Sequence, residues 1–327
     1  MVTLPVKDAL ELGARVLAHI GYDEKDAHII VMHMIEGAWS GYPHTGLSRI
    51  LAILDEPRTH RPRSAPRLLR ETPVSAVLDG GNTVGYLVAY EAMELSIQKA
   101  KANGLAAVTF TNTYFSGRNS FYLEKIADAG LIGVHAASTP PWVAPFGGSR
   151  PALGVNPIGF GFPCLPHPIT CDFGTASFMW GEIILHDRMG LPLPTGVAID
   201  DKGRDTTDPA AALRGAILPF GGHKGYTLNV AVQMLCMLGF QEALPRPQDE
   251  FGFVFFVIDP TLFAPLEVFL ANARRLAEWI AATPAREGAQ VRIPSARATA
   301  LKAENAQKGM ISVEKNVYEQ LLARAGG

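Results

Sequence analysis

The chain of 327 residues lacks several features of secreted and membrane proteins. Its three cysteines show no metal-site spacing and cannot all pair within the chain, which favours a reducing compartment: Cys164, Cys171 and Cys236. The N-terminus has no apolar core of a signal peptide, and no apolar run reaches the roughly 18–20 residues that span a bilayer. We therefore predict a cytoplasmic protein with no membrane association.

An excess of charge is also absent. The chain has 29 Lys and Arg against 31 Asp and Glu. Its formal charge of −2 gives no reason to expect nucleic acid as a partner. Hydrophobic residues make up 48% of the chain, which is typical of a soluble enzyme with a substantial core. Five arginines among prolines predict a solvated connector: Arg58, Arg61, Arg63, Arg67 and Arg70.

The sequence has no G-x-G-x-x-G after its first predicted strand, so the usual dinucleotide fingerprint is missing. An α/β pattern is nevertheless present. The first 55 or so residues are predicted to be helical, and strands at 74–78, 106–110 and 132–137 then alternate with helices at 84–102 and 120–129. Later patterns predict helices at 228–240, 269–282 and 313–325 and a strand at 254–259.

One lysine stands between glycines at the start of a predicted buried helix, in the segment Pro219-Phe-Gly-Gly-His-Lys-Gly-Tyr226. The glycines permit a tight turn and let a ligand approach the backbone, while a helix N-terminus offers free N–H groups to phosphate or carboxylate. Lys224 opposes the helix dipole there, so its place suggests an anion. The alternative is an ordinary glycine-rich turn with a solvated lysine.

Three further turns have the same make-up, at 146–148, 156–157 and 172–177. Each combines backbone donors with small side chains at the end of a predicted strand or the start of a predicted helix. Together with the lysine turn, they favour a long ligand with phosphates and polar rings, such as a dinucleotide.

In this order the motifs resemble those of the malate/L-lactate dehydrogenase-type oxidoreductases, a family distinct from the Rossmann lactate dehydrogenases. It includes ureidoglycolate and sulfolactate dehydrogenases and the piperideine- and pyrroline-2-carboxylate reductases. The resemblance covers nearly the whole chain, through 154–161, 172–176, Gly181, 203–209, 219–225, 258–260 and 292–294. It implies a non-Rossmann α/β fold, an NAD(P)-dependent redox reaction on a small 2-oxo, 2-hydroxy or 2-imino acid, and a homodimer.

The same resemblance implies three parts. These are a helical N-terminal region at 1–75, a cofactor-binding α/β domain at 76–224, and C-terminal segments at 225–327 that return to the N-terminal region.

Two segments depart from the family pattern. Where members carry Ser-His-Gly-x-x-Arg, the chain has Pro-His-Thr-Gly-Leu-Ser-Arg, so that the family histidine falls on Thr45 and His44 lies one residue earlier. Members also carry Asn-x-x-His-Phe-Gly, with the histidine as acid and base. The chain reads Asn-Thr-Tyr-Phe-Ser-Gly-Arg from 112 to 118, and we assign Tyr114 to the histidine's place. Both expected proton carriers are thus replaced.

These residues give a hypothesis for the site. Arg49 binds the substrate carboxylate through its planar guanidinium. Tyr114 or His44 supplies the proton, Tyr114 if Lys224 or Arg118 lowers its pKa. Lys224 binds phosphate or polarises the substrate. The expected contacts to NADH or NADPH are Asn156, Pro157, Gly159, Asp172, Thr175, Gly222, His223 and Gly225, and no metal is expected.

Several alternatives stay open. Reduction of C=N is easier than that of C=O because an iminium already carries its proton, so the lost histidines favour a cyclic 2-imino acid reductase acting on pyrroline- or piperideine-2-carboxylate. A cofactor-binding protein that has lost catalysis and a non-redox enzyme on the same scaffold are further alternatives. For single residues the structural alternatives are a packed Tyr114, an ordinary ion pair for Arg49 and a capping role for Asp172. Substrate identity, coenzyme choice and reaction direction stay open.

Overall fold

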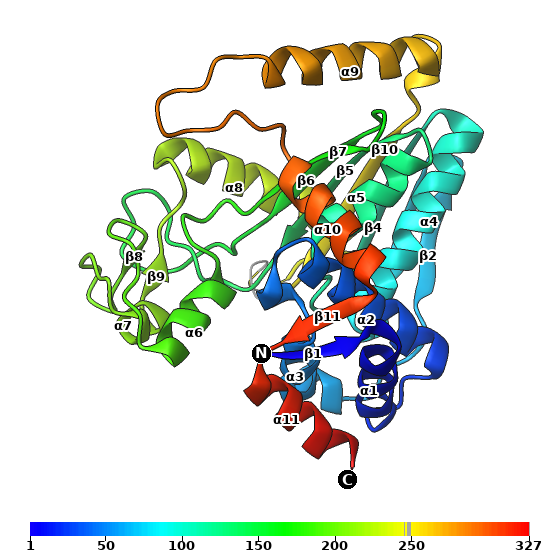
Figure 1. The fold of residues 1–327 in the computed structure, drawn as a ribbon. Helices are drawn as coiled ribbons and strands as arrows, with labels where there is room; N and C mark the ends of the chain where they lie inside the picture. The colour runs from blue at the N-terminus through cyan, green and yellow to red at the C-terminus, as the bar shows by residue number, and fades with distance from the viewer. Residues whose placement is uncertain (245, 247–249, 327) are drawn as a thin grey trace.

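A computed structural model describes residues 1–244, 246 and 250–326 of the chain. Within these residues the centre is a seven-stranded mixed sheet in the order β2-β3-β4-β10-β5-β6-β7 (Figure 1). Among its described pairs, β3 and β4 alone run parallel. The strands are β2 (Arg67–Thr72), β3 (Ser75–Asp79), β4 (Leu105–Thr111), β5 (Ile132–Ser138), β6 (Ile158–Phe162), β7 (Ile169–Phe173) and β10 (Gly252–Ile258).

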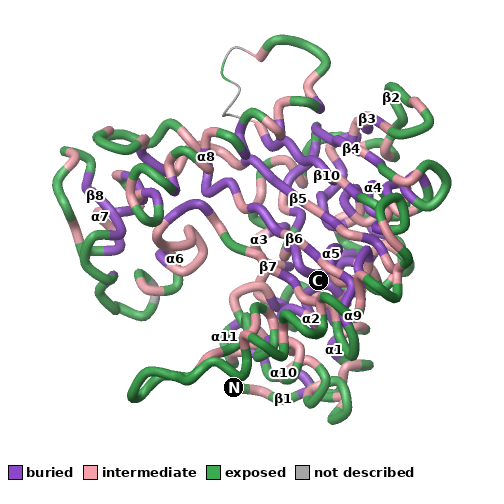
Figure 2. Tube along the Cα trace, turned by 90° about the horizontal axis from the view of Figure 1, so that it is seen from above, coloured by how far each residue is buried: buried purple, intermediate pink, exposed green. Residues whose placement is uncertain are grey.

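The side chains of β10 show why the sheet is covered on both faces. Phe253, Phe255 and Val257 belong to the large core under α4 (Gly85–Asn103) and α5 (Asn119–Asp128). Val254 belongs to a second core under α8 (His223–Cys236), because successive side chains of a strand point to opposite faces. Figure 2 shows the buried residues concentrated along these central strands.

The N-terminal helices are α1 (Val6–Ala18), α2 (Glu24–Trp39), η1 (Pro43–Thr45), α3 (Ser48–Asp55) and η2 (Pro57–His60). Among them, α2 packs against α4 and α5, and the C-terminal segments return to α1, α2 and α3. The returning segments are α10 (Ala296–Lys308), β11 (Met310–Val313) and α11 (Lys315–Ala325). β1 (Val2–Pro5) pairs antiparallel with β11, with Val2 opposite Val313. The predicted packing of helical terminal segments is confirmed.

A smaller lobe follows β7, with its own apolar core that includes Val143, Ile183 and Ile217. Its elements are α6 (Trp180–Met189), β8 (Ala198–Ile199), α7 (Pro209–Arg214) and β9 (Ala216–Ile217). After α8 come η3 (Met237–Gly239), β10, η5 (Pro260–Leu262) and α9 (Leu266–Ala281), and α9 lies at the edge of the molecule before the chain loops back to α10 (Figure 1). No helix in the described part of the chain is both long and apolar enough to cross a bilayer.

The prediction of a solvated connector at 58–70 is confirmed for Arg61, Arg67 and Arg70, which are exposed, and is wrong for Arg58 and Arg63. Arg58 is only 15% exposed at its side chain, donates to the carbonyl oxygen of Thr113 (2.8 Å) and pairs with Glu250. Arg63 donates to the carbonyl oxygen of Ile20 (2.6 Å) and lies over the ring of Tyr22. Arg58 and Arg63 instead anchor η2 and the chain after it to backbone oxygens and an aromatic ring elsewhere in the fold, and the exposed remainder of the segment forms the edge strand β2.

Candidate functional site

The four glycine- and proline-rich turns meet at the N-terminal end of α8. The backbone N–H of Thr175 donates to the carbonyl oxygen of Val155 (2.9 Å), and that of Phe220 donates to the carbonyl oxygen of Thr175 (3.1 Å). On the other side, the rings of Phe146 and His223 lie 6.1 Å apart. The structure therefore brings together the turns that are spread between residues 146 and 225 of the sequence.

Asn156 holds these turns in place from inside the protein. Its side-chain nitrogen donates to the amide oxygens of Asn229 (2.7 Å) and Gln233 (2.9 Å) on α8, and its oxygen accepts from the backbone N–H of Thr139 (3.2 Å). Asn156 is fully buried and has a φ of 35°, in the left-handed region. Its side chain thus fastens the turn to α8 and does not face outward.

Four other predicted coenzyme contacts shape the turns in the same way. The carbonyl oxygen of Pro157 accepts from Ala137 of β5 (3.0 Å), and the buried hydroxyl of Thr175 donates to Val155 (3.0 Å). A side chain at Gly159 would press against Leu123 of α5, and one at Gly225 would clash with the carbonyl oxygen of Phe220. These glycines are required by close packing.

The exposed part of the turn cluster is the start of α8. Gly221 and Gly222 have φ values of 57° and 64°, and a Cβ on Gly221 would meet nothing within 4 Å. His223 and Lys224 are exposed, and the backbone bonds of α8 begin with the N–H of Tyr226, which donates to Gly222 (3.1 Å). The preceding N–H groups of the first turn are therefore available to an anion.

Three exposed phenylalanines surround this helix start. Phe146 and Phe220 lie beside His223 and Gly222, and the rings of Phe173 and Phe220 are 6.1 Å apart, edge to face. Backbone donors, a lysine and apolar ring faces are the groups that phosphates and flat heterocycles need. The residues present here therefore fit a dinucleotide.

A second group of side chains comes from η1, α3 and the loop after β4. The guanidinium carbon of Arg49 lies 4.8 Å from the centre of the Phe115 ring, and the charge of Arg49 counteracts the rise that burial causes in the pKa of the nearby Tyr86 phenol. Burial lowers the pKa of His44, the charge of Arg49 adds to this effect, and Glu182 of α6 opposes it. His44, Arg49 and Phe115 are thus neighbours, and Glu182 brings the smaller lobe beside them. Phe115 and Glu182 were missing from the sequence hypothesis.

The hydroxyl of Tyr114 bonds Thr59 of η2 and none of the side chains of this second group. The side chain is buried, its hydroxyl lies 2.8 Å from that of Thr59, and burial raises its pKa. The sequence hypothesis required a cation to lower that pKa, so the surroundings of Tyr114 oppose the role that we assigned to it.

The histidine positions of the family pattern are filled by other side chains. Counted from Asn112 to Gly117, the histidine of Asn-x-x-His-Phe-Gly falls on Phe115, so the assignment of Tyr114 to that place was one residue early. The other position holds Thr45, whose hydroxyl donates to the carbonyl oxygen of Tyr42 (2.8 Å). Neither position carries a group that can act as an acid at neutral pH.

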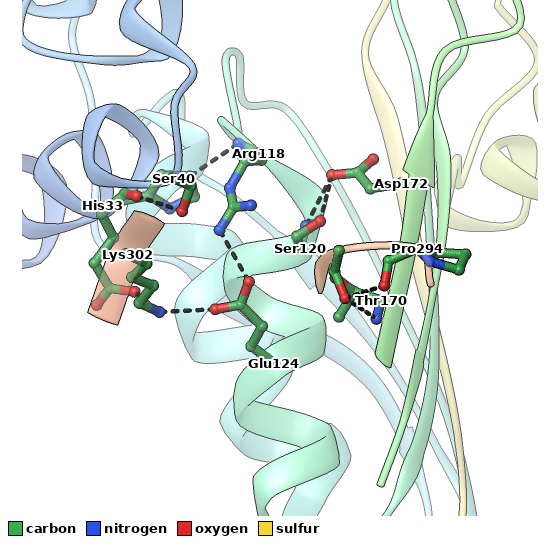
Figure 3. A network of polar contacts seen from close by, with 11 residues as sticks. His33, Ser40, Arg118, Ser120, Glu124, Thr170, Asp172, Pro294 and Lys302 are labelled. Atoms are coloured by element: carbon green, nitrogen blue, oxygen red, sulfur yellow. Dashed lines mark hydrogen bonds and ion pairs between the residues drawn. The ribbon is translucent and has the colours of Figure 1, made fainter. Parts of the chain in front are cut away.

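Asp172 links the turn at 172–177 to the start of α5, and Figure 3 shows its contact with Ser120. Its carboxylate accepts from the backbone N–H (2.9 Å) and hydroxyl (3.0 Å) of Ser120 and from the amide of Asn119 (3.2 Å) at the start of α5. Burial raises the pKa of this carboxyl, while these bonds and Arg118 counteract the rise. These contacts of Asp172 are those of a cap on the first turn of α5, as in the structural alternative. They fix the turn at 172–177 against the loop that carries Phe115.

A chain of polar contacts then ties this loop to the returning C-terminal segment (Figure 3). The backbone N–H of Arg118 donates to Nε2 of His33 (2.8 Å), and the Arg118 guanidinium pairs with Glu124 (3.0 Å). Lys302 of α10 pairs with the same Glu124 (2.7 Å) and with Glu36 of α2 (2.5 Å). Arg118 is thereby neutralised within the protein.

A cavity of about 860 Å³ lies elsewhere, at the carboxyl ends of β3 and β4. Arg58, Asp79, Asn112 and Glu250 are among the residues that line it. Three of its charged groups already have partners, since Arg58 pairs with Glu250 and Asp79 pairs with Arg67 (2.7 Å) and accepts from Asn112 (2.7 Å). None of the predicted site residues lines this cavity.

Comparisons with known proteins identify the same family that the order of the sequence motifs resembles. Residues 4–322 match the model of a family described as malate/L-lactate dehydrogenase. The L-sulfolactate dehydrogenase of Methanocaldococcus jannaschii is 33% identical over 94% of this chain and 91% of its own length. The Delta(1)-pyrroline-2-carboxylate reductase 2 of Burkholderia multivorans is 30% identical over 98% of this chain and 97% of its own. A solved structure of sulfolactate dehydrogenase from M. jannaschii is similar with a TM-score of 0.88 and 31% identity, and covers 99% of this chain and 97% of that one.

Proposed function

Because the chain belongs to the malate/L-lactate dehydrogenase family and is therefore an oxidoreductase, we propose that it transfers hydride between NADH or NADPH and C2 of a small 2-oxo or 2-hydroxy carboxylic acid. The observation that carries the proposal is the meeting of four separate turns at the start of α8, with Asp172 tying one of them to the start of α5 and Glu182 of the smaller lobe acting on His44. The turns serve the coenzyme, and the charged group serves the acid.

On the coenzyme side, the first turn of α8 and Lys224 bind phosphate, and the rings of Phe146, Phe173 and Phe220 lie against the flat groups. Gly222 and His223 contribute backbone that a ligand can approach closely. Asn156, Pro157, Gly159, Asp172, Thr175 and Gly225 act by fixing the turns. The bound coenzyme supplies the hydride, and the protein supplies position and charge.

On the substrate side, Arg49 binds the carboxylate and His44 handles the proton. Burial lowers the pKa of His44, so its imidazole is mostly neutral at pH 7, and its cationic form, which accumulates at lower pH, gives the proton to the oxygen that develops negative charge. Tyr114 was the other candidate, but its hydroxyl is bonded to Thr59 and its pKa is raised. We therefore assign proton transfer to the substrate oxygen to His44 and not to Tyr114.

A second candidate substrate is a cyclic 2-imino acid. The observation that favours it is the occupation of both family histidine positions, by Phe115 and by Thr45 with its hydroxyl bonded to Tyr42. An iminium arrives with its proton, so its reduction needs no strong acid from the protein. One relative is named as a pyrroline-2-carboxylate reductase, which supports this candidate.

We also propose that two copies of the chain form a homodimer through α9. This helix buries none of its residues, and Val268, Leu276 and Trp279 recur along it at helical spacing while exposed. An apolar stripe of this kind on a single subunit indicates a surface that another subunit covers. The three free cysteines favour the reducing cytoplasm as the place of assembly.

Titration of nicotinamide fluorescence with NADH and NADPH tests the coenzyme site. The Lys224→Met variant should weaken coenzyme binding by roughly tenfold to a hundredfold, since it removes a charge-assisted bond to phosphate. Lys202→Met, an exposed lysine in another loop, is the control and should bind as the wild type does. Unchanged affinity in Lys224→Met would remove that residue from the site.

The substrate is then identified by reduction assays with pyruvate, oxaloacetate and pyrroline-2-carboxylate. Turnover of the first two with either coenzyme supports the main proposal, and turnover of the third alone supports the imino acid. Tight coenzyme binding with no turnover would instead support the alternative of a cofactor-binding protein that has lost catalysis. Absence of binding to either coenzyme contradicts the proposed function.

A further inference from the structure

Phe115 has a backbone conformation that a large side chain rarely adopts. Its φ of 53° lies in the left-handed region, where glycine and asparagine are common and bulky residues are outliers. Strain of this kind persists only where the surroundings impose it, and it gathers at functional sites. The ring is held by edge-to-face contacts with Tyr114 (5.6 Å) and Phe251 (6.1 Å). These contacts leave a ring face turned to Arg49.

The contacts of Arg49 differ from those of two other inward-facing arginines. Arg118 and Arg58 are each neutralised by a glutamate, Glu124 and Glu250. Within the described part of the chain, Arg49 has no carboxylate partner, and its guanidinium lies over the Phe115 ring with the Tyr86 phenol close enough to feel its charge. A ring face and a phenol fix the direction of a guanidinium without cancelling its charge. The alternative of an ordinary ion pair for Arg49 is not what the structure shows.

We infer that Phe115 and Tyr86 are positioning residues, which hold Arg49 in one orientation with its charge free for the carboxylate of the substrate. Tyr86 is almost completely buried on α4, so its phenol is held in one place. The ring of Phe115 lies under the guanidinium of Arg49. The aromatic ring in the family's histidine place thus serves substrate binding and not proton transfer. This inference rests on the proposed function, in which Arg49 binds the acid.

The test compares Phe115→Leu, which removes the ring face, with Phe115→Tyr, which keeps it. Phe115→Leu should raise the KM of the acid by about threefold to thirtyfold, the range expected for loss of a cation–π contact, while kcat and the coenzyme Kd change less than about twofold. Phe115→Tyr should keep the KM of the wild type to within about twofold. Equal KM values in Phe115→Leu and the wild type overturn the inference.

A double-mutant cycle separates positioning from a general structural effect. In the background of Arg49→Met, Phe115→Leu should have no further effect on KM, because the group that it positions is gone. An equal effect in both backgrounds contradicts the inference. If Phe115→Leu does not fold, Tyr86→Phe replaces it, since only a hydroxyl is lost, and the same two outcomes decide.

Binding of oxalate to the coenzyme-free protein, measured by calorimetry, separates this inference from the proposed function. If no 2-oxo or 2-imino acid is turned over, the proposed function fails, while oxalate binding still tests Arg49. Weaker binding in both Phe115→Leu and Arg49→Met supports the positioning role. Wild-type affinity in Phe115→Leu, or no oxalate binding by the wild-type protein, overturns it.

Discussion

The protonation of His44 determines how the site handles a proton. Burial is the largest cause that lowers its pKa, Arg49 acts in the same direction, and Glu182 opposes both. A lowered pKa means that the imidazole becomes cationic only below the usual histidine range near pH 6.5. The acid form of His44 is therefore scarce at neutral pH and accumulates as the pH falls.

We predict that kcat/KM for reduction of a 2-oxo acid rises as the pH falls through the lowered pKa of His44 and levels off below it. His44→Asn should lose this rise and about a hundredfold of activity at the acid plateau, the lower end of what a general acid contributes. His28→Asn changes an exposed histidine and should keep the wild-type profile. A pH–rate profile unchanged by His44→Asn would exclude the residue as the proton donor.

For single residues, the sequence predicted the parts of the site that depend on local patterns, and it could not predict those that depend on contacts between distant residues. The glycines and Lys224 at the start of α8 could be found because a turn before a helix is a local pattern. The inward direction of Asn156 could not, because it depends on Asn229, which lies far along the chain and is brought close by folding. The role of Phe115 depends in the same way on Arg49 and Tyr86.

Among the elements, the start of α8 leaves no room for a side chain at Gly225. Gly225 in its first turn lies against the carbonyl oxygen of Phe220, so that even a methyl group would collide with the backbone. The turn that ends at Phe220 and the first turn of α8 are thus fixed relative to each other.

We predict that Gly225→Ala destabilises the protein by about 1–3 kcal/mol, because the backbone must shift to relieve overpacking, and that coenzyme binding weakens with it. Gly181→Ala is the matched control, since Gly181 lies in the first turn of α6 and a Cβ there would meet nothing within 4 Å. It should be neutral or stabilise by up to about 1 kcal/mol through helix propensity. Urea unfolding measures both changes, and equal stability of the two variants would contradict this packing argument.

Several of the elements that the sequence predicted have apolar residues that face a core, whereas the predicted helix at 269–282 is α9, whose apolar stripe is exposed. The predicted helix at 120–129 is α5 at Asn119–Asp128, and the predicted strand at 132–137 is β5 at Ile132–Ser138. By contrast, α10 was missed because Ala298 is its one buried residue, and it is held by Lys302 and by Asn305, which donates to Trp39 (3.0 Å). β2 was missed because it is an exposed edge strand rich in charge.

For the whole molecule, the exposed stripe on α9 predicts association. Trp279 is 80% and Leu276 61% exposed on a helix that buries none of its residues. Trp279→Lys should raise the dissociation constant of the dimer by at least about thirtyfold, as expected when a tryptophan at an interface contributes 2 kcal/mol or more. Sedimentation velocity measures the change, with Met189→Lys on α6 as an exposed apolar control. A monomeric wild-type protein would refute the proposed homodimer.

The order of the strands was beyond the sequence. The strand at 254–259 was predicted, and the structure has it as β10 at Gly252–Ile258. Its place between β4 and β5 follows from long-range pairing that periodicity does not report. The segment after residue 225 therefore contributes both to the sheet and to the layer around α1.

This position of β10 matters for a chain that is made from one end to the other. A ribosome completes β4 and β5 well before it reaches Gly252, and until then each of these strands lacks the neighbour that joins them. Their open edges are a template for pairing with other nascent polypeptides. The growing chain must therefore be shielded, by its own collapse or by chaperones, until translation has delivered the strand that closes the gap.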